Sequence, residues 1–308
     1  MKSIFIQWLT ISVLSFVCQP SIAQTNEADS EPKFEMISIP LTLRSPKDRA
    51  EYLVKHYWDR FDFNDIRHIS HSKEAEQALA NYLDLKNHVS MDVMSSSIKE
   101  TLKKAEVNKK MFSFMAGLIE KYLYEPESPL EDDELLISAL EYITEESSID
   151  EAEKIRPAML LKLVLNNRIG TTAANFKYKL ADGTTGKLHD IESDYLILFF
   201  NDPDCLQCNE TSEQMSHSFV VNDFIKRGIL KVLSLYPYDN VAGWRSHQKF
   251  MPKEWINSYD NGCEIMNNEI YDLKSTPTLY LLSKDKRVLL KNCDLAKIEL
   301  YLSRANTN

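Results

Sequence analysis

The sequence predicts an α+β chain, in which an all-helical N-terminal domain over residues 34–167 precedes an α/β domain over residues 168–308. Two observations carry this prediction. Apolar residues recur at helical spacing through the first part of the chain, where glycine is rare. After Arg168 the apolar period becomes two, and strand patterns alternate with helical ones. This change of period places the domain boundary near residues 168–172.

The N-terminal domain begins with an alternating segment, residues 37–43, which predicts a short strand or an extended arm. Ser45 and Pro46 then mark a helix start, with Ser45 as the N-cap and Pro46 as the first helical residue. Pro157 is expected to kink or split the last helix. The further helices are expected over residues 72–88, 91–105, 108–124, 132–144 and 149–167.

The C-terminal domain opens with a predicted hairpin that turns at Asp182 and Gly183. The apolar run Tyr195–Phe200 reads as a buried strand. A helix is expected from Cys205 to about Arg227. The following elements are expected to be a strand at 229–235, a long insert at 236–262, a helix at 265–273, strands at 279–282 and 287–291, and a closing helix at 295–302.

Residues 1–23 have the features of a cleaved secretory signal peptide. Lys2 supplies the positive start, residues 4–17 are mostly apolar but too short to span a bilayer, and Ser21-Ile22-Ala23 forms a small-x-small cleavage site. The sequence therefore predicts export to the periplasm. Cys18 leaves a lipid anchor as the less favoured alternative, because bulky residues precede it.

The formal net charge of −10 argues against nucleic acid as a partner. No glycine-rich phosphate loop and no G-x-S-x-G motif occurs in the sequence, so neither nucleotide binding nor serine hydrolysis is supported. We expect no cofactor.

The main candidate for chemistry is Cys205-Leu206-Gln207-Cys208, which directly follows the buried strand and a short turn. Export places these thiols in an oxidising compartment, where disulfides persist. A helix N-terminus presents unpaired N–H groups and the positive end of the helix dipole, both of which favour a thiolate. A second thiol one turn later can resolve a mixed disulfide. The arrangement therefore indicates a redox-active pair.

The order of hairpin, strand-CxxC-helix, strand, helix, Thr276-Pro277-Thr278, hairpin and helix resembles the thioredoxin-like fold with a mixed central sheet, especially envelope thiol-disulfide oxidoreductases. The segment Arg49–Trp58, together with Phe61–Asp65, resembles an uncharacterised helical domain found ahead of thioredoxin-like domains in envelope proteins of Bacteroidota. No activity is known for that helical domain.

This resemblance implies that Cys205 attacks and Cys208 resolves. It also implies that Thr276-Pro277 has a cis peptide bond and shapes the substrate groove. Implied partners are cysteine-containing envelope proteins and a membrane thiol-redox partner. One departure concerns Asp204, which stands where thioredoxins usually have tryptophan. A carboxylate beside the thiol opposes its ionisation, so Asp204 is expected to modulate the site and to slow exchange.

Other interpretations of the two cysteines remain open. The pair could be a structural disulfide on a non-catalytic interaction scaffold. A zinc site is disfavoured because no second CxxC or CxxH pair occurs in the sequence. A peroxiredoxin-type peroxidase is disfavoured because Pro203-Asp204-Cys205 lacks the required hydroxyl residue and spacing. The direction of electron flow is left open.

Several further residues have two readings each. Cys263 and Cys293 either form a second disulfide or remain thiols. His56, Tyr57 and Trp58 are read as core residues rather than a site. Trp244 and Trp255 are expected to pack the long insert, with a lip over Cys205 as the alternative. His189 and His217 have no companions that suggest a ligand set.

Overall fold

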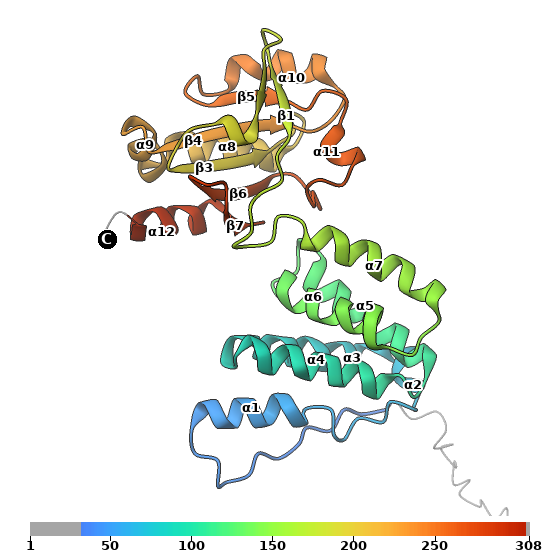
Figure 1. Ribbon diagram of the computed structural model, residues 1–308. Coiled ribbons are helices and arrows are strands. Elements are labelled where there is room, and N and C mark those ends of the chain that lie inside the picture. The colour runs from blue at the N-terminus through green and yellow to red at the C-terminus, as the bar shows by residue number, and fades with distance from the viewer. Residues whose placement is uncertain (1–31, 306–308) are drawn as a thin grey trace, which may run out of the picture.

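The N-terminal half of the chain is a bundle of helices, and the longer helices bury apolar residues in a shared core. The structure is a computed structural model that describes residues 32–305. Figure 1 shows the helices stacked below the sheet domain. They are α1 (Pro46–His56), α2 (Arg67–Ser70), α3 (Ser72–Asp84), the short η2 (Leu85–His88), α4 (Met91–Ala105), α5 (Lys109–Tyr124), α6 (Asp133–Glu141), the π-helical η3 (Tyr142–Glu146) and α7 (Glu151–Leu165).

The bundle core is rich in aromatic side chains near its start. Tyr57 and Trp58 are buried, and the Trp58 ring lies 5.2 Å from Tyr57 and 5.6 Å from Tyr82. Both residues are therefore core, as predicted. The prediction is wrong for His56, whose side chain is 43% exposed and whose Nδ1 lies 2.7 Å from an Asp59 carboxylate oxygen. Ser45 caps α1 by accepting a hydrogen bond from the Asp48 N–H, which confirms the predicted helix start.

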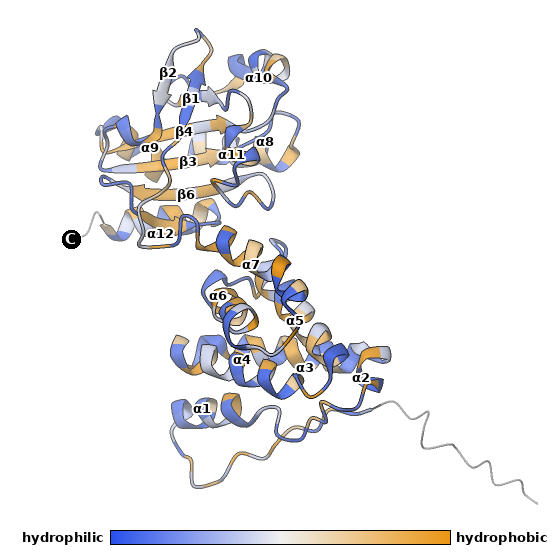
Figure 2. Ribbon diagram, turned by 45° about the vertical axis from the view of Figure 1, so that its right-hand side comes forward, coloured by the Kyte–Doolittle hydropathy of each residue, from blue (hydrophilic) through white to orange (hydrophobic). Residues whose placement is uncertain are grey.

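The C-terminal half forms a mixed seven-stranded sheet with the strand order β2-β1-β5-β4-β3-β6-β7. The central strands β3, β4 and β5 are parallel, whereas β6, β7, β1 and β2 join as antiparallel neighbours. Figure 2 shows apolar residues concentrated in β3, β4 and β6. The strands are β1 (Lys177–Leu180), β2 (Thr185–Lys187), β3 (Tyr195–Phe200), β4 (Leu230–Tyr236), β5 (Ile256–Tyr259), β6 (Thr278–Ser283) and β7 (Val288–Lys291).

Helices cover this sheet and connect its strands: η4 (Leu188–Asp190), α8 (Leu206–His217), α9 (Phe219–Lys226), α10 (Val241–His247), η5 (Gln248–Phe250), α11 (Glu264–Asn267) and α12 (Leu295–Ala305). Residues of β3 alternate between two cores. Leu196, Leu198 and Phe200 face one core, and Ile197 and Phe199 face the other. A strand buried on both faces needs a continuous apolar run, which is what the sequence supplies. The predicted α+β class and mixed sheet are confirmed.

Several predicted element boundaries are wrong. Residues 37–43 form no strand, which leaves the predicted alternative of an arm outside the sheet; this arm turns at Pro40, whose carbonyl accepts from the Leu43 N–H. The predicted helix from Cys205 to Arg227 is two helices, because Ser218 is extended and caps α9 through the Val221 N–H. Pro157 lies inside α7 without splitting it.

The predicted helix at 265–273 is shorter than expected. Helix α11 ends at Asn267, and Glu269 has a φ of 50°, which is incompatible with continuing a helix. Strand β5 was not predicted, since Asn257 and Ser258 are poor strand formers. Ser258 is fully buried, and its hydroxyl donates to the Ser234 carbonyl on β4.

A buried ion cluster joins the two domains. Lys274 Nζ lies 2.7 Å from Glu131 Oε1 and 3.2 Å from Asp133 Oδ1, and Lys291 Nζ lies 2.7 Å from Asp133 Oδ2. The two lysine side chains are only 5% and 4% exposed. Tyr124 contributes as well, since its hydroxyl donates to Asp272 Oδ1 over 3.0 Å. Because buried charges must be paired to be tolerated, this cluster holds the helical domain in place against the segment that precedes β6.

Candidate active site

The site begins where β3 ends, at a loop that local hydrogen bonds hold in shape. The buried Asn201 donates through Nδ2 to the Ser234 hydroxyl on β4, over 2.8 Å. Asp202 Oδ1 accepts from the Asp204 N–H over 2.9 Å, and the Asp202 carbonyl accepts from the Cys205 N–H over 3.1 Å. An aspartate that bonds to the backbone two residues on forms a tight turn. This turn places Cys205 at the N-cap of the next helix.

Cys205 is the N-cap residue of α8, and its sulfur accepts a hydrogen bond from the Cys208 N–H over 3.1 Å. Cys205 is partly buried, whereas Cys208 is only 2% exposed. The backbone N–H and the helix dipole both stabilise negative charge on the Cys205 sulfur. The geometry thus distinguishes an accessible sulfur from a sheltered one.

The Thr276–Pro277 peptide bond is cis and lies directly before β6. The Thr276 carbonyl oxygen accepts from Cys205 Sγ over 3.4 Å. The fold therefore brings Cys205, Cys208 and Thr276-Pro277 together although 71 residues separate Cys205 from Thr276. Asp204 is exposed at the entrance to α8. Its influence on the thiol stays a prediction.

Burial changes the acid–base behaviour of the Cys208 thiol. Burial raises the pKa of the Cys208 thiol to about 12, and the contact with the Cys205 side chain adds to the rise. Cys208 therefore remains a protonated thiol at neutral pH while it is buried. A sheltered thiol of this kind suits a resolving residue better than an attacking one.

In the reduced protein, iodoacetamide at pH 8 is expected to alkylate Cys205 and to spare Cys208. With a pKa of about 12, only about one Cys208 in ten thousand is a thiolate at that pH, and the thiolate is the reactive form. Peptide mass spectrometry of a time course measures the two rates separately. Comparable alkylation of both residues in the folded protein would contradict the assignment.

Tyr238 is a neighbour of the cysteines that the sequence did not reveal. It follows the end of β4, and its ring packs 5.6 Å from that of Tyr236. Burial raises the pKa of Tyr238, while Thr276 lowers it; charge on Asp202 and on the two cysteines raises it further. Its place in the sequence could have revealed it, because Tyr238 follows β4 as Cys205 follows β3, and these parallel strands end at the same edge of the sheet.

The other candidate residues lie elsewhere or are structural. Trp244 and Trp255 are both buried, against Tyr259 and Phe199 respectively, so they pack the insert as predicted. Cys263 and Cys293 are both free thiols. His189 and His217 each bond to a backbone carbonyl. Within residues 32–305, no three His, Cys, Asp or Glu side chains gather in a way that could hold a metal ion.

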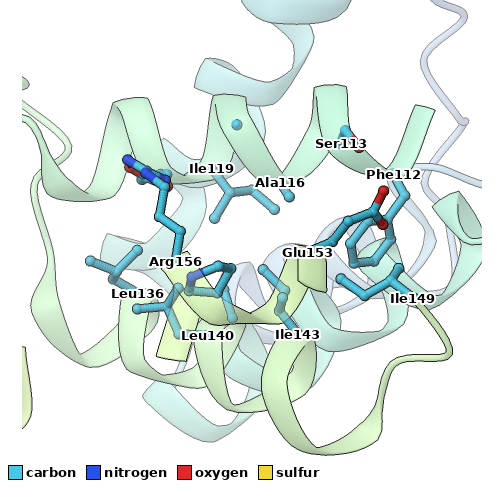
Figure 3. A pocket seen from close by; sticks show the side chains of 14 residues that line it. Phe112, Ser113, Ala116, Ile119, Leu136, Leu140, Ile143, Ile149, Glu153 and Arg156 are labelled. Atoms are coloured by element: carbon cyan, nitrogen blue, oxygen red, sulfur yellow. The ribbon is translucent and has the colours of Figure 1, made fainter. Parts of the chain in front are cut away.

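A separate cavity of about 230 Å³ lies between α5, α6 and α7 in the helical domain. Figure 3 shows apolar side chains around it, including Phe112, Ile119 and Ile143. Arg156, at its edge, pairs with Glu120. This cavity belongs to the helical domain and is separate from the cysteine pair.

A family model matches the N-terminal part of the chain, and a solved structure matches nearly all of it. Residues 17–167 match a family described as a domain of unknown function, DUF5106. The crystal structure of a thioredoxin-like protein from Bacteroides caccae is similar over nearly its whole length. The identity is 42%, the match covers 89% of this chain and 99% of that one, and the TM-score is 0.85. This likeness spans both domains.

Shorter structures match less than half of the chain. The C-terminal domain of an uncharacterised protein from Bacteroides fragilis is 45% identical and covers 44% of this chain and 98% of its own, with a TM-score of 0.44. The thioredoxin domain of a thiol-disulfide oxidoreductase from Bacteroides vulgatus is 14% identical and covers 44% of this chain and 96% of its own, with a TM-score of 0.40. No curated protein matches the chain.

Proposed function

This chain belongs to the family of thioredoxin-like proteins, with a DUF5106 domain ahead of the thioredoxin-like domain, and from that premise we propose that it exchanges thiols and disulfides through Cys205 and Cys208. One observation carries the proposal. The Cys205 sulfur lies at the N-terminus of α8, where it contacts the Cys208 N–H on one side and the carbonyl before cis-Pro277 on the other.

The proposed reaction has two steps. The Cys205 thiolate attacks one sulfur of a substrate disulfide, a Cys205–substrate bond forms, and the first substrate sulfur leaves as a thiolate that takes up a proton. Cys208 then loses its proton and attacks the Cys205 sulfur, which releases the second substrate thiol and leaves a Cys205–Cys208 disulfide. Two electrons pass to the substrate. A second protein with two thiols then reduces the Cys205–Cys208 disulfide and so returns the two electrons. In the reverse direction, the same steps oxidise a substrate.

The substrates that fit this chemistry are cysteine-containing exported proteins, with a membrane thiol-redox protein as the electron partner. The features of residues 1–23 support export to the periplasm. That segment and Cys18 lie outside the described residues. Among residues 32–305, no helix has the length and apolarity needed to cross a bilayer.

The reduction potential of the Cys205/Cys208 couple tests the proposal. An exchanging pair is expected to have a potential above about −300 mV, since structural disulfides usually lie below that value. The mature protein is equilibrated with glutathione or dithiothreitol buffers and trapped by alkylation. A lower value, with no exchange on hydroxyethyl disulfide, would instead support a non-catalytic scaffold with a structural bridge.

A mixed disulfide offers the complementary test. Cys208→Ser is expected to accumulate a Cys205 adduct with hydroxyethyl disulfide, visible by intact mass, because no second thiol resolves it. The Cys205→Ser/Cys208→Ser double variant is the control and should form no adduct at this site.

A further inference from the structure

A cleft of about 570 Å³ lies between the two domains and opens beside the cysteine pair. One wall is a single face of α8, which includes Gln207 and Glu210, and the cis-proline loop at Pro277 adjoins it. The opposite wall is the loop between α5 and α6, which includes Glu127. Gln207 lies between the two cysteines in the sequence, and Pro277 follows the carbonyl that Cys205 contacts, so the cleft adjoins the cysteine pair although neither cysteine of the pair lines it.

The lining of this cleft carries more negative than positive charge. Glu127, Glu210 and Asp294 are exposed along it, and none of them belongs to an ion pair between the described residues. Lys274, the cation that lines the cleft, is only 5% exposed and is already bound to Glu131 and Asp133. Asp294 already accepts a hydrogen bond from the Lys297 N–H through Oδ1, whereas no ion pair within residues 32–305 holds Glu127 or Glu210. Exposed carboxylates beside a cleft attract cationic groups and can bond to the fork of an arginine or to a lysine.

A second feature points to a peptide as the ligand. Asn292 lines the cleft, and both its amide nitrogen and its amide oxygen are shielded from solvent without a hydrogen-bond partner among the described residues. Buried polar atoms normally have a partner. Asn292 as a residue is partly exposed, so a rotation of its side chain would turn an amide donor and acceptor, which complement the C=O and N–H of a peptide backbone, into the cleft.

The wall that the helical domain contributes is fixed in position. Glu131 lines the cleft four residues after Glu127 and holds Lys274, which lies two residues before Thr276. The ammonium group of Lys274 also lies 4.2 Å from the centre of the Tyr124 ring. The carboxylates of the helical domain thus keep a defined distance from the cis-proline loop, as selective recognition requires.

We propose that this interdomain cleft binds a basic segment of the polypeptide substrate next to the cysteine that exchanges. This inference rests on the proposed function and deepens it, because it assigns the helical domain a role in substrate choice. The preferred substrates would have lysine or arginine within a few residues of the reacting cysteine.

Two synthetic peptides test the inference. Each holds one cysteine as a mixed disulfide with mercaptoethanol, and they differ only in three flanking lysines or three flanking glutamates. Reduced wild-type protein is expected to exchange about tenfold faster with the lysine peptide at low ionic strength. Salt at 0.5 M should reduce this preference, since it screens exposed charges.

The matched variants are Glu127→Gln with Glu210→Gln, and Glu213→Gln as the control on the same helix outside the cleft. The double variant should lower the preference to about twofold, and Glu213→Gln should retain it. Each rate is divided by the rate of the same protein on hydroxyethyl disulfide. Equal wild-type rates on both peptides, or a preference unchanged in the double variant, would overturn the cleft assignment alone. No exchange with any of the three disulfides would overturn the proposed function.

Discussion

Replacing Asp133 by alanine is expected to lower the free energy of unfolding by about 3–5 kcal/mol. Asp133 contacts both Lys274 and Lys291, whose side chains are almost completely buried. Without this carboxylate, Lys274 keeps Glu131, whereas Lys291 keeps only the backbone carbonyls of the α7 end. A buried charge that loses its partner carries an uncompensated desolvation cost, which is far larger than the loss of a surface pair. Urea unfolding followed by circular dichroism measures the change.

Glu100→Gln is the matched control. Glu100 and Lys103 form an exposed pair at 3.9 Å. Such surface pairs contribute little, so the control should change stability by less than about 0.5 kcal/mol. A loss of under about 1 kcal/mol for Asp133→Ala would show that the interdomain cluster does not hold the domains together in the way described.

The difference in unfolding free energy between wild type and Asp133→Ala is expected to depend on pH. Burial tends to raise the pKa of Asp133, but Lys291 and Lys274 outweigh it, and the net pKa lies below the ordinary value. A carboxyl whose pKa is lower in the folded state stabilises the fold fully above its unfolded pKa of about 4. The difference between wild type and variant should therefore be largest near neutral pH and shrink as the pH falls below about 4.

Cys205→Ser is expected to reduce the exchange rate on hydroxyethyl disulfide by about a thousandfold or more. The serine hydroxyl forms no useful nucleophile at neutral pH, and Cys208 cannot replace it because that thiol is buried and its pKa is raised to about 12. The rate is followed by mass spectrometry of the mercaptoethanol released.

Cys263→Ser serves as the control for this variant, because it removes another partly buried thiol at a helix start outside the cysteine pair. It should retain exchange within about twofold. Residual exchange of more than a tenth of the wild-type rate in Cys205→Ser would mean that another thiol attacks.

The sequence revealed the parts of the site whose signals are local or come from the family. The apolar strand, the turn and the CxxC helix start are contiguous, so periodicity and capping rules identified them. The cis bond before Pro277 followed from the resemblance. What could not be predicted depends on contacts between distant residues. Lys274 and Glu131 are 143 residues apart, and neither stands out in its own segment.

The wrong element boundaries have similar causes. Asn257 and Ser258 are polar, so their own preferences predict a loop. They lie in β5 because β4 on one side and β1 on the other complete the hydrogen bonds of that strand. Ser218 interrupts an otherwise continuous helical pattern, because its hydroxyl serves both as the cap of α9 and as a donor to Glu299 on α12. Each of these positions is determined by its tertiary partner rather than by its own propensity.

The division of charge across the domain interface also determines which surfaces are complementary at that interface. In the ion cluster the helical domain contributes the carboxylates Glu131 and Asp133, and the other domain contributes the lysines, with Asp272 as the exception that bonds to Tyr124. Two helical domains that met through this face would place carboxylate against carboxylate, and two thioredoxin-like domains would place lysine against lysine. Like charges in contact are strongly unfavourable, so this face favours the pairing of unlike domains and disfavours self-association through either half.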